Sequence, residues 1–349
     1  MKNLLVITQK VDQNDDHRGF FIDWLKEFGK KFDEVYVITV AGGTFSLPDN
    51  IHVYSLGKDR GTNKFVQAIR FYGILVRLLP KSVGVFAHAS AIFVVASWPL
   101  AFVFRKKIVL WYLHRSVTFR LKLAEIMCYK IVTAAKESLK FTSDKIVETG
   151  HGIRVEEFET ARDWNKKEQL KILSVGRISK IKNYETLLKA AAILKIKGID
   201  FNVTIVGQPV MSSDTDYLNY LKSLQNELGL QKEVQFIGSV PYHQMPSLNK
   251  SADIVVGLTP NGGIDKALLE GMASGCIALT SNTVNKKYFG SYAEKLIFKH
   301  GSPESLTNKI LALEELSMEE KNQISRFLVD MIKEKHNLKN LAETISKLY

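Results

Sequence analysis

Residues 173–188 read LSVGRISKIKNYETLL, and residues 262–275, further along the same half of the chain, read GGIDKALLEGMASG. In both places a strand-like apolar run leads through a turn into a helix-like run; for the second stretch the apolar run is DIVVGL, residues 253–258, just before it. The first stretch places Arg177 and Lys182 just past a strand end, and the second places two glycines ahead of a helix that carries Glu270. Backbone N–H groups and the helix dipole favour an anion at a helix N-terminus, and a carboxylate beside it suits the hydroxyls of a ribose. The two stretches together predict a site for a nucleoside diphosphate.

Strand-like and helix-like runs alternate through both halves of the chain, a pattern typical of parallel sheets covered by helices on both faces. A length of 349 residues suits two domains of ordinary size. We therefore expect an α/β fold of two Rossmann-like domains, over residues 1–160 and 168–335, with the polar stretch 156–168 as a linker. In such sheets ligands bind outside the carboxyl ends of the strands.

The phrase Val175-Gly176-Arg177 with Lys182, followed by LEGMASG at residues 269–275, resembles the family 4 (group 1) glycosyltransferases of GT-B fold. In that family VGR-x4-K opens the C-terminal domain, and a Glu-x7-Glu signature runs into a phrase like LEAMASG. This chain departs from the signature at one position, because the first glutamate is replaced by Gly262.

The resemblance implies that the two domains face each other across a cleft, with the acceptor on the N-terminal side and the nucleotide sugar on the C-terminal side. A final helix, residues 336–349, is implied to cross back to the N-terminal domain. The implied reaction moves a sugar from a nucleotide-diphosphate sugar to a hydroxyl acceptor with retention at the anomeric carbon. Domain closure would exclude water from this reaction.

The resemblance also assigns roles to particular residues. Arg177 and Lys182 are expected to stabilise the leaving diphosphate, Glu270 to hold the ribose, and His114 to lie near the donor sugar. The predicted catalytic residues are His114, Arg177 and Lys182, and the predicted donor-binding residues are Gly19, Gly262, Gly263, Asp265 and Glu270.

Several of these residues also have plain structural readings. A histidine at a strand end, such as His114 or the weaker candidate His88, is often structural. The helix is expected to begin at Ile264. Asp265, near its N-terminus, either replaces part of the contact of the missing glutamate or stabilises the helix dipole. Gly19 stands alone where family members have a glycine-rich loop, so it is only a partial match.

No cofactor and no metal site are predicted. The sequence Asp214-Thr215-Asp216 mimics an Asp-x-Asp metal motif, but it precedes a helix, where aspartate serves as an N-cap. The two cysteines, Cys128 and Cys276, are far apart and lack metal-ligand spacing. The donor nucleotide sugar is thus expected as a substrate without a metal.

The net charge of +12 is uneven, because residues 51–150 hold 16 Lys and Arg against 5 Asp and Glu. A basic face can meet anionic lipid or a phosphorylated acceptor; nothing resembles a nucleic-acid-binding module. The apolar and basic segment 64–81 is either a core helix or an interfacial helix. The uncharged segment 82–104 divides more naturally into strand, helix and strand than into a membrane span. We expect a cytoplasmic protein, with the inner membrane as a candidate peripheral partner.

The function predicted from the sequence is therefore a glycosyltransferase of bacterial surface-polysaccharide or glycolipid synthesis, with a glycan or lipid-linked acceptor. Two alternatives remain at this point. Gly262 motivates a non-catalytic partner subunit that keeps the fold, and the fold also hosts other sugar-nucleotide enzymes such as epimerases. The lack of a Gly-x-Gly-x-x-Gly after the first strand of either half argues against an NAD-dependent enzyme.

Overall fold

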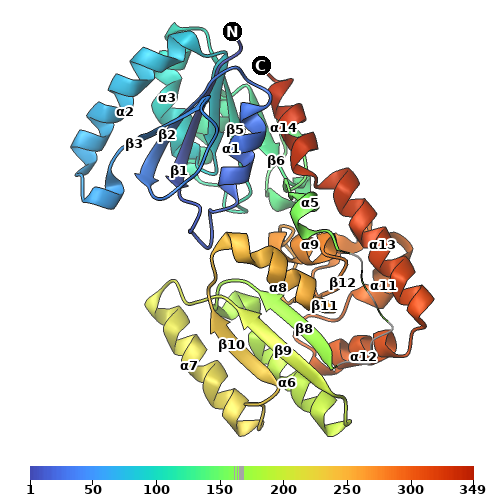
Figure 1. Ribbon diagram of the computed structural model, residues 1–349. Helices are drawn as coiled ribbons and strands as arrows, with labels where there is room; N and C mark the ends of the chain where they lie inside the picture. Colours follow the sequence, from blue (N-terminus) through green and yellow to red (C-terminus); the bar gives the residue numbers. More distant parts are fainter. Residues whose placement is uncertain (161, 163, 165–168) are drawn as a thin grey trace. The chain divides into compact units, whose positions relative to one another are not determined.

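The computed structural model describes residues 1–160, 162, 164 and 169–349 and divides into two compact units (Figure 1). The N-terminal unit comprises Met1–Arg154, Pro241–His243 and His336–Tyr349, and the C-terminal unit comprises Val155–Val240 and Gln244–Lys335. Part of the predicted linker is a short helix, α5 (Val155–Phe158), which packs on helices of the C-terminal unit. The linker prediction for residues 161, 163 and 165–168 lies outside the described residues.

The N-terminal unit is built on a seven-stranded sheet in which every pair is parallel, in the order β3-β2-β1-β4-β5-β6-β7. Its central strands are continuous apolar runs because helices cover both faces of the sheet. The strands are β1 (Leu4–Val11), β2 (Val35–Gly42), β3 (Ile51–Ser55), β4 (Gly84–His88), β5 (Lys107–Trp111), β6 (Lys130–Thr133) and β7 (Ile146–Glu148).

Two hydrophobic cores lie on opposite faces of this sheet. One core contains residues of α2 (Lys64–Leu78), α3 (Ala91–Val103) and α4 (Phe119–Met127). The other contains residues of α1 (Phe21–Gly29) and of the last helix, α14 (Leu338–Ser346). The chain thus returns to its first sheet, and Tyr349 Oη donates a hydrogen bond to the Val85 carbonyl at 2.7 Å.

The uncharged segment 82–104 forms strand β4 and helix α3, with strand β5 directly after it. The segment is therefore interrupted by a turn and is no single helix. Among the helices that the structure describes, none is both long enough and apolar enough to cross a bilayer.

The C-terminal unit has a five-stranded parallel sheet in the order β10-β9-β8-β11-β12. Its strands are β8 (Leu170–Val175), β9 (Phe201–Val206), β10 (Val234–Gly238), β11 (Ile254–Gly257) and β12 (Ile277–Thr280). Its longer helices are α6 (Tyr184–Ile196), α7 (Ser212–Glu227), α8 (Met245–Ser251), α9 (Lys266–Ala273), α12 (Pro303–Glu314) and α13 (Met318–Lys335), with the single turns α10 (Lys286–Phe289) and α11 (Ala293–Leu296). The predicted α/β class with two Rossmann-like domains is confirmed.

Candidate functional site

The candidate site lies where the strand order of the C-terminal sheet reverses. From β8 the chain first adds β9 and β10 on one side and then β11 and β12 on the other. The loops that follow β8 and β11 therefore diverge at their carboxyl ends and leave the crevice in which such sheets bind ligands. Parts of the two stretches 173–188 and 262–275 form these loops, since Gly176 follows β8 and residues 258–265 follow β11.

Two glycines let the ends of β8 and β9 approach closely. A Cβ atom on Gly207, whose φ is 144°, would lie 2.0 Å from the carbonyl oxygen of Gly176. A Cβ on Gly176 would lie 2.8 Å from Cε of Lys182. The missing side chains thus make room for the Lys182 side chain to lie across the backbone at the end of β8.

Lys182 and Asp265 join the two loops. Lys182 Nζ is 2.5 Å from Asp265 Oδ2, and both side chains are largely buried. Asp265 is also the N-cap of α9, because its Oδ1 accepts a hydrogen bond from the Ala267 N–H at 3.3 Å. Asp265 therefore caps the helix, which is one of the two readings given by the sequence, and it also pairs with Lys182. Its contact with the donor sugar stays a prediction.

Arg177 takes a different direction from Lys182. Its Nε is 3.9 Å from Oδ2 of Asp214, a carboxylate that is 5% exposed. Asp214 lies in the first turn of α7, and Met211 is the N-cap, so the expectation that Asp214 itself caps the helix was wrong by three positions. Asp214 Oδ2 nevertheless accepts hydrogen bonds from the Val210 and Met211 N–H groups, which is a structural role.

Gly262 and Gly263 lie in the loop ahead of α9, and the helix begins at Lys266. The Gly263 carbonyl accepts a hydrogen bond from Asn282 Nδ2 at 3.0 Å, which fixes the loop against the segment after β12. Helix α9 thus begins at Lys266, shortly after a glycine pair, and a helix N-terminus is a position where backbone N–H groups and the helix dipole favour an anion.

Glu270 is 4% exposed, one turn into α9, and its carboxylate is paired with the ammonium group of Lys266. Sequence reasoning did not assign Lys266 a role. The signal was present, because Lys266 and Glu270 are four residues apart and hence neighbours on one helix face. The site thus holds three cations, each near one carboxylate: Arg177 with Asp214, Lys182 with Asp265, and Lys266 with Glu270.

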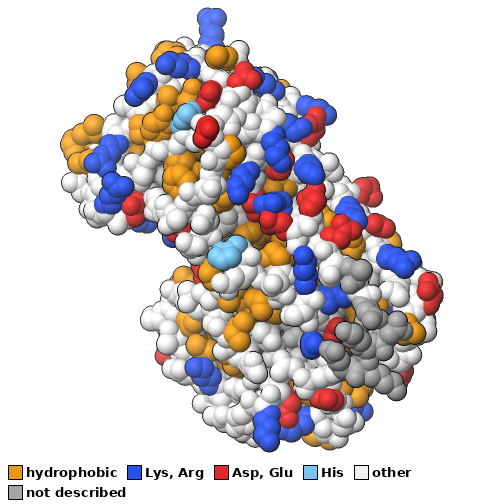
Figure 2. Space-filling model, viewed as in Figure 1, with side chains coloured by type: hydrophobic (Ala, Val, Ile, Leu, Met, Phe, Trp, Pro, Cys, Tyr) orange, Lys and Arg blue, Asp and Glu red, His pale blue; other side chains and the backbone are white. Residues whose placement is uncertain are grey.

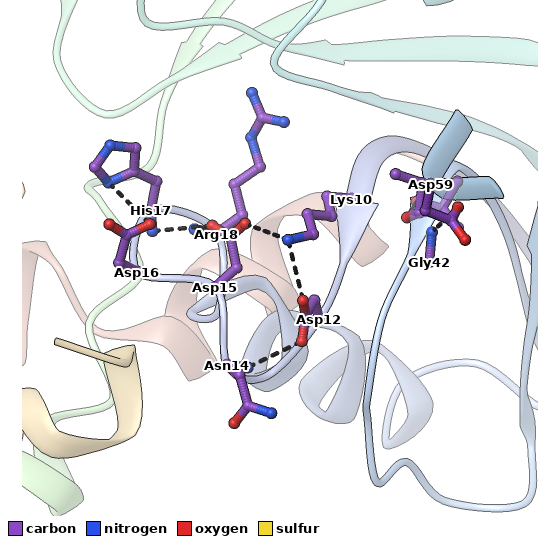
Figure 3. A network of polar contacts seen from close by, with 11 residues as sticks. Lys10, Asp12, Asn14, Asp15, Asp16, His17, Arg18, Gly42 and Asp59 are labelled. Carbon is purple, nitrogen blue, oxygen red and sulfur yellow. Dashed lines mark hydrogen bonds and ion pairs between the residues drawn. The ribbon is translucent and has the colours of Figure 1, made fainter. Parts of the chain in front are cut away.

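In the N-terminal unit, Gly19 closes the loop after β1. Its N–H donates to the Asp15 carbonyl at 2.9 Å, and a Cβ at this position would lie 2.6 Å from the same oxygen. Figure 3 shows the network that holds this loop, in which Lys10 bonds to Asp15 at 2.8 Å and pairs with Asp12 at 3.0 Å. The hydrogen bond to Asp15 raises the pKa of Lys10, although burial opposes it. The sequence did not indicate this network.

The two candidate histidines have different surroundings. His114 is exposed and lies three residues beyond the end of β5, in the loop before α4, with its ring near that of Tyr112. His88 is the last residue of β4 and is buried, stacked on Phe21 at 3.9 Å between ring centroids. Its Nδ1 is hydrogen-bonded to Thr8 Oγ1 at 3.0 Å, so its structural reading is the better supported one.

His88 should make the stability of the protein depend on pH. Burial, followed by the charge of Arg18, lowers its pKa to about 3, against 6.5 in an unfolded chain. Between these values only the unfolded state binds the proton. The free energy of unfolding should therefore rise with pH in this window, by up to about 1.4 kcal/mol per pH unit from this residue. Urea unfolding at pH 7.5 and pH 5 should show a smaller difference in His88→Gln than in the wild type; an equal difference would contradict the assignment.

Two parallel α/β units, each with its switch point at the centre of the sheet, define the GT-B class of folds. Across 99% of both chains the structure superposes with that of HepE from Anabaena, solved in complex with UDP and glucose, with a TM-score of 0.77 at 13% sequence identity. At this identity the likeness concerns the fold alone.

Residues 156–327 match the family model "Glycosyl transferases group 1". This segment therefore has the sequence of a group 1 glycosyltransferase, as the motifs within it predicted. It is 27% identical over 106 residues to mannosylfructose-phosphate synthase of Agrobacterium fabrum, and 30% identical over 134 residues to the capsular polysaccharide biosynthesis glycosyltransferase CapH of Staphylococcus aureus. These segments are 30% and 38% of this chain, but only 23% and 36% of the two relatives' own lengths.

Proposed function

We propose that this protein is a glycosyltransferase that uses a nucleotide-diphosphate sugar as donor. The observation that carries the proposal is the meeting of Lys182, Asp265 and the Lys266–Glu270 pair at the switch point of the C-terminal sheet. These cations and the start of α9 suit a diphosphate, and a buried carboxylate suits the vicinal hydroxyls of a ribose. The family match and the solved UDP complex of a protein with the same fold support the assignment.

The proposed chemistry is an exchange of ion partners. A diphosphate at the start of α9 draws Lys182 and Arg177 toward its oxygens, and the ribose hydroxyls donate to Glu270. As the bond from the anomeric carbon to the diphosphate breaks, negative charge grows on the leaving group, where these cations and the N–H groups after Gly262 and Gly263 stabilise it. The anomeric carbon forms a bond to the acceptor oxygen, and the proton of the acceptor hydroxyl passes to the leaving diphosphate. Retention at the anomeric carbon is what the family resemblance implies.

We assign the contacts with the donor sugar to Asp265 and His114. Gly262 has no side chain to offer, and the nearest carboxylate along the loop is that of Asp265, already held beside Lys182. His114 is exposed, so its ring is accessible to a ligand. Gly19, in the loop after β1, would allow the backbone of that loop to approach the donor closely.

The proposal includes no metal and no resident cofactor. Within the described residues, no three His, Cys, Asp or Glu side chains gather in a way that would hold a metal ion. The charge that a metal would supply to a diphosphate is assigned to Arg177, Lys182 and Lys266 instead.

The test is a thermal-shift screen of the purified protein with UDP, GDP, ADP and CMP. A ligand that binds only the folded state raises the melting temperature. We expect a shift with one nucleoside diphosphate, lost in Glu270→Ala and in Arg177→Ala. Glu227→Ala removes an exposed carboxylate at the end of α7 in the same unit and should leave the shift intact. A protein stabilised by none of the nucleotides would overturn the donor-site assignment.

A non-catalytic partner subunit is the second candidate, and the observation that favours it is Gly262 in place of a glutamate. Such a subunit would bind the nucleotide without turning over the sugar conjugate. Hydrolysis or transfer of the donor that disappears in Lys182→Ala would exclude this candidate.

For the acceptor we propose a glycan or lipid-linked glycan of the bacterial surface. The similarity to CapH, which is named for capsular polysaccharide biosynthesis, supports this class. The composition of the N-terminal unit supports it as well, because residues 61–124 contain ten Lys and Arg and no Asp or Glu.

We further propose that α2 docks on an anionic membrane surface. Four large apolar side chains, with exposed fractions between 43% and 75%, recur along one face of the helix at helical spacing: Phe65, Ile69, Tyr72 and Val76. Lys64, Arg70 and Arg77 lie on the same helix beside this stripe. Figure 2 shows hydrophobic and basic side chains gathered over α2. Apolar burial combined with attraction to anionic lipid is the chemistry of interfacial helices.

Replacing Phe65 and Ile69 with serine should weaken binding to vesicles of phosphatidylcholine and phosphatidylglycerol by about tenfold or more, since each buried side chain contributes roughly 1.5–3 kcal/mol. The measurement is co-sedimentation with the vesicles. Ile196→Ser with Val210→Ser removes two exposed side chains of the C-terminal unit and is the matched control. Equal binding of both double variants would contradict the proposal.

A further inference from the structure

A cavity of about 470 Å³ lies at the carboxyl ends of β2 and β3, at one edge of the N-terminal sheet. It is separate from the switch point between β1 and β4, and the proposed donor chemistry does not use it. Its volume falls within the roughly 300–1,000 Å³ of small-molecule sites. Its walls are the Gly42–Gly43 segment, Ser55 of β3, the short 3-10 turn η1 (Lys58–Arg60) and Arg70 in the middle of α2.

Asp59 holds the floor of this cavity in place. Its Oδ1 accepts a hydrogen bond from the Gly42 N–H at 2.9 Å and another from Ser55 Oγ at 3.2 Å, so η1 is tied to the ends of both strands. The bond from Gly42 is the main cause of the lowered pKa of Asp59, which keeps the carboxylate ionised. Figure 3 shows this contact beside the Lys10 network.

Two arginines supply more positive charge than Asp59 neutralises. Arg60 Nε is 3.6 Å from Asp59 Oδ2, and Arg70 Nη1 donates to the Leu56 carbonyl at 3.3 Å. A guanidinium has five N–H donors in a planar fork, so each arginine has donors left for a ligand. Gly57, at φ 84°, permits the approach of Arg70, because a Cβ there would lie 2.7 Å from Nη1.

The remaining lining is neutral and suits the body of a sugar or polyol. The ring of Phe45 is partly exposed at the cavity wall, and Ser55 and the backbone of Gly43 offer small polar groups. Gly43 packs against the loop after β1, because a Cβ there would lie 2.2 Å from Cγ of Asp12. The wall is therefore fixed by the Lys10 network.

We propose that this cavity binds the phosphate of a hydroxyl-bearing ligand, a sugar or polyol phosphate, through Arg60 and Arg70. The proposal rests on the proposed function, since such a group would belong to the acceptor or to the lipid surface that carries it. Arg70 projects from α2, the same helix whose apolar stripe is proposed to meet the membrane. The phosphate can therefore come from a lipid headgroup or from a free sugar phosphate, and the chemistry of recognition is shared.

The test is calorimetric titration of the full chain with glycerol 3-phosphate and glucose 6-phosphate, with glucose as the uncharged reference. We expect saturable binding of the phosphates that weakens at least tenfold in R60Q/R70Q. The double variant R120Q/K122Q removes two exposed cations of α4 and should bind as the wild type does. If the double variant fails to fold, Arg60→Gln alone replaces it in the titration, because the Arg60 side chain is 82% exposed and its substitution should not disturb folding.

A second arm identifies the source of the phosphate. The cavity is assigned to a lipid headgroup if two results are found together. R60Q/R70Q binds phosphatidylglycerol vesicles more weakly than R120Q/K122Q does, and the wild type does not bind the soluble phosphates. Equal losses in the two double variants in both arms would overturn the proposal. The nucleotide shift, measured separately in Glu270→Ala, shows whether the donor site exists, so failure of one proposal is distinguishable from failure of the other.

Discussion

Lys182→Ala should lower the rate of donor turnover by about 10²–10³-fold, the usual cost of removing one group that stabilises developing negative charge. The side chain lies across Gly176 at the switch point and is 2.5 Å from Asp265 Oδ2. Its removal takes a cation from the leaving diphosphate and from Asp265, whose negative charge lies in the same place. The measurement is the initial rate of sugar release from the nucleotide sugar that the thermal-shift screen identifies.

Lys180→Ala is the matched control for this prediction. Lys180 lies in the same short 3-10 turn, η4 (Lys180–Lys182), but is exposed. It carries the same charge at two residues' distance, so the control separates a specific contact from a general loss of positive charge. A loss of rate that is equal in both variants would remove Lys182 from the proposed site, and the melting temperature of each variant separates a loss of rate from unfolding.

Gly207→Ala should destabilise the C-terminal unit by about 3 kcal/mol or more, because positive-φ strain and overpacking each cost roughly 1–3 kcal/mol. The new Cβ would lie 2.0 Å from the Gly176 carbonyl oxygen, a backbone atom that has no rotamer by which to move aside. The ends of β8 and β9 would have to separate, which would displace the Gly176–Lys182 segment. Urea unfolding gives the change in stability, and the nucleotide shift gives its effect on the site.

Gly229→Ala isolates the steric part of this effect. Gly229 also has positive φ, at 64°, and belongs to the same unit, but a Cβ there meets no atom within 4 Å. It should cost about 1 kcal/mol, the strain of a left-handed residue alone. Similar losses in the two variants would mean that the contact between Gly207 and Gly176 is relieved elsewhere at little cost.

Local patterns were sufficient to predict the alternation of strands and helices and to single out the two stretches proposed as the candidate site. The apolar runs and the glycines before α9 are local signals, and the carboxyl ends of parallel strands bring loops together by topology alone. The start of α9 was predicted two residues early, because Asp265 caps the helix and Ile264 lies before it. The residue at which a helix begins depends on which side chain accepts a hydrogen bond from the first backbone N–H groups of the helix. Hydrophobic periodicity gives no information about that side chain.

Contacts between residues far apart in the chain were beyond sequence reasoning. Lys182 and Asp265 are brought together only by the pairing of β8 with β11. The approach of Gly207 to Gly176 follows from the pairing of β8 with β9, although Gly207 has no motif of its own. The direction of Arg177 toward Asp214 depends likewise on the packing of α7.

The sequence by itself determined the α/β class, the two-domain organisation and the family resemblance, because periodicity and the spacing of the VGR-x4-K and LEGMASG phrases are properties of short segments. Only the tertiary structure decided which carboxylate faces each cation, that His88 is buried against Phe21, and that Arg60 and Arg70 share a cavity with Asp59. The physical reason is that charge pairing and burial depend on distance in space. That distance is set by the registry of the strands and the packing of helices on them, which no short stretch of sequence encodes.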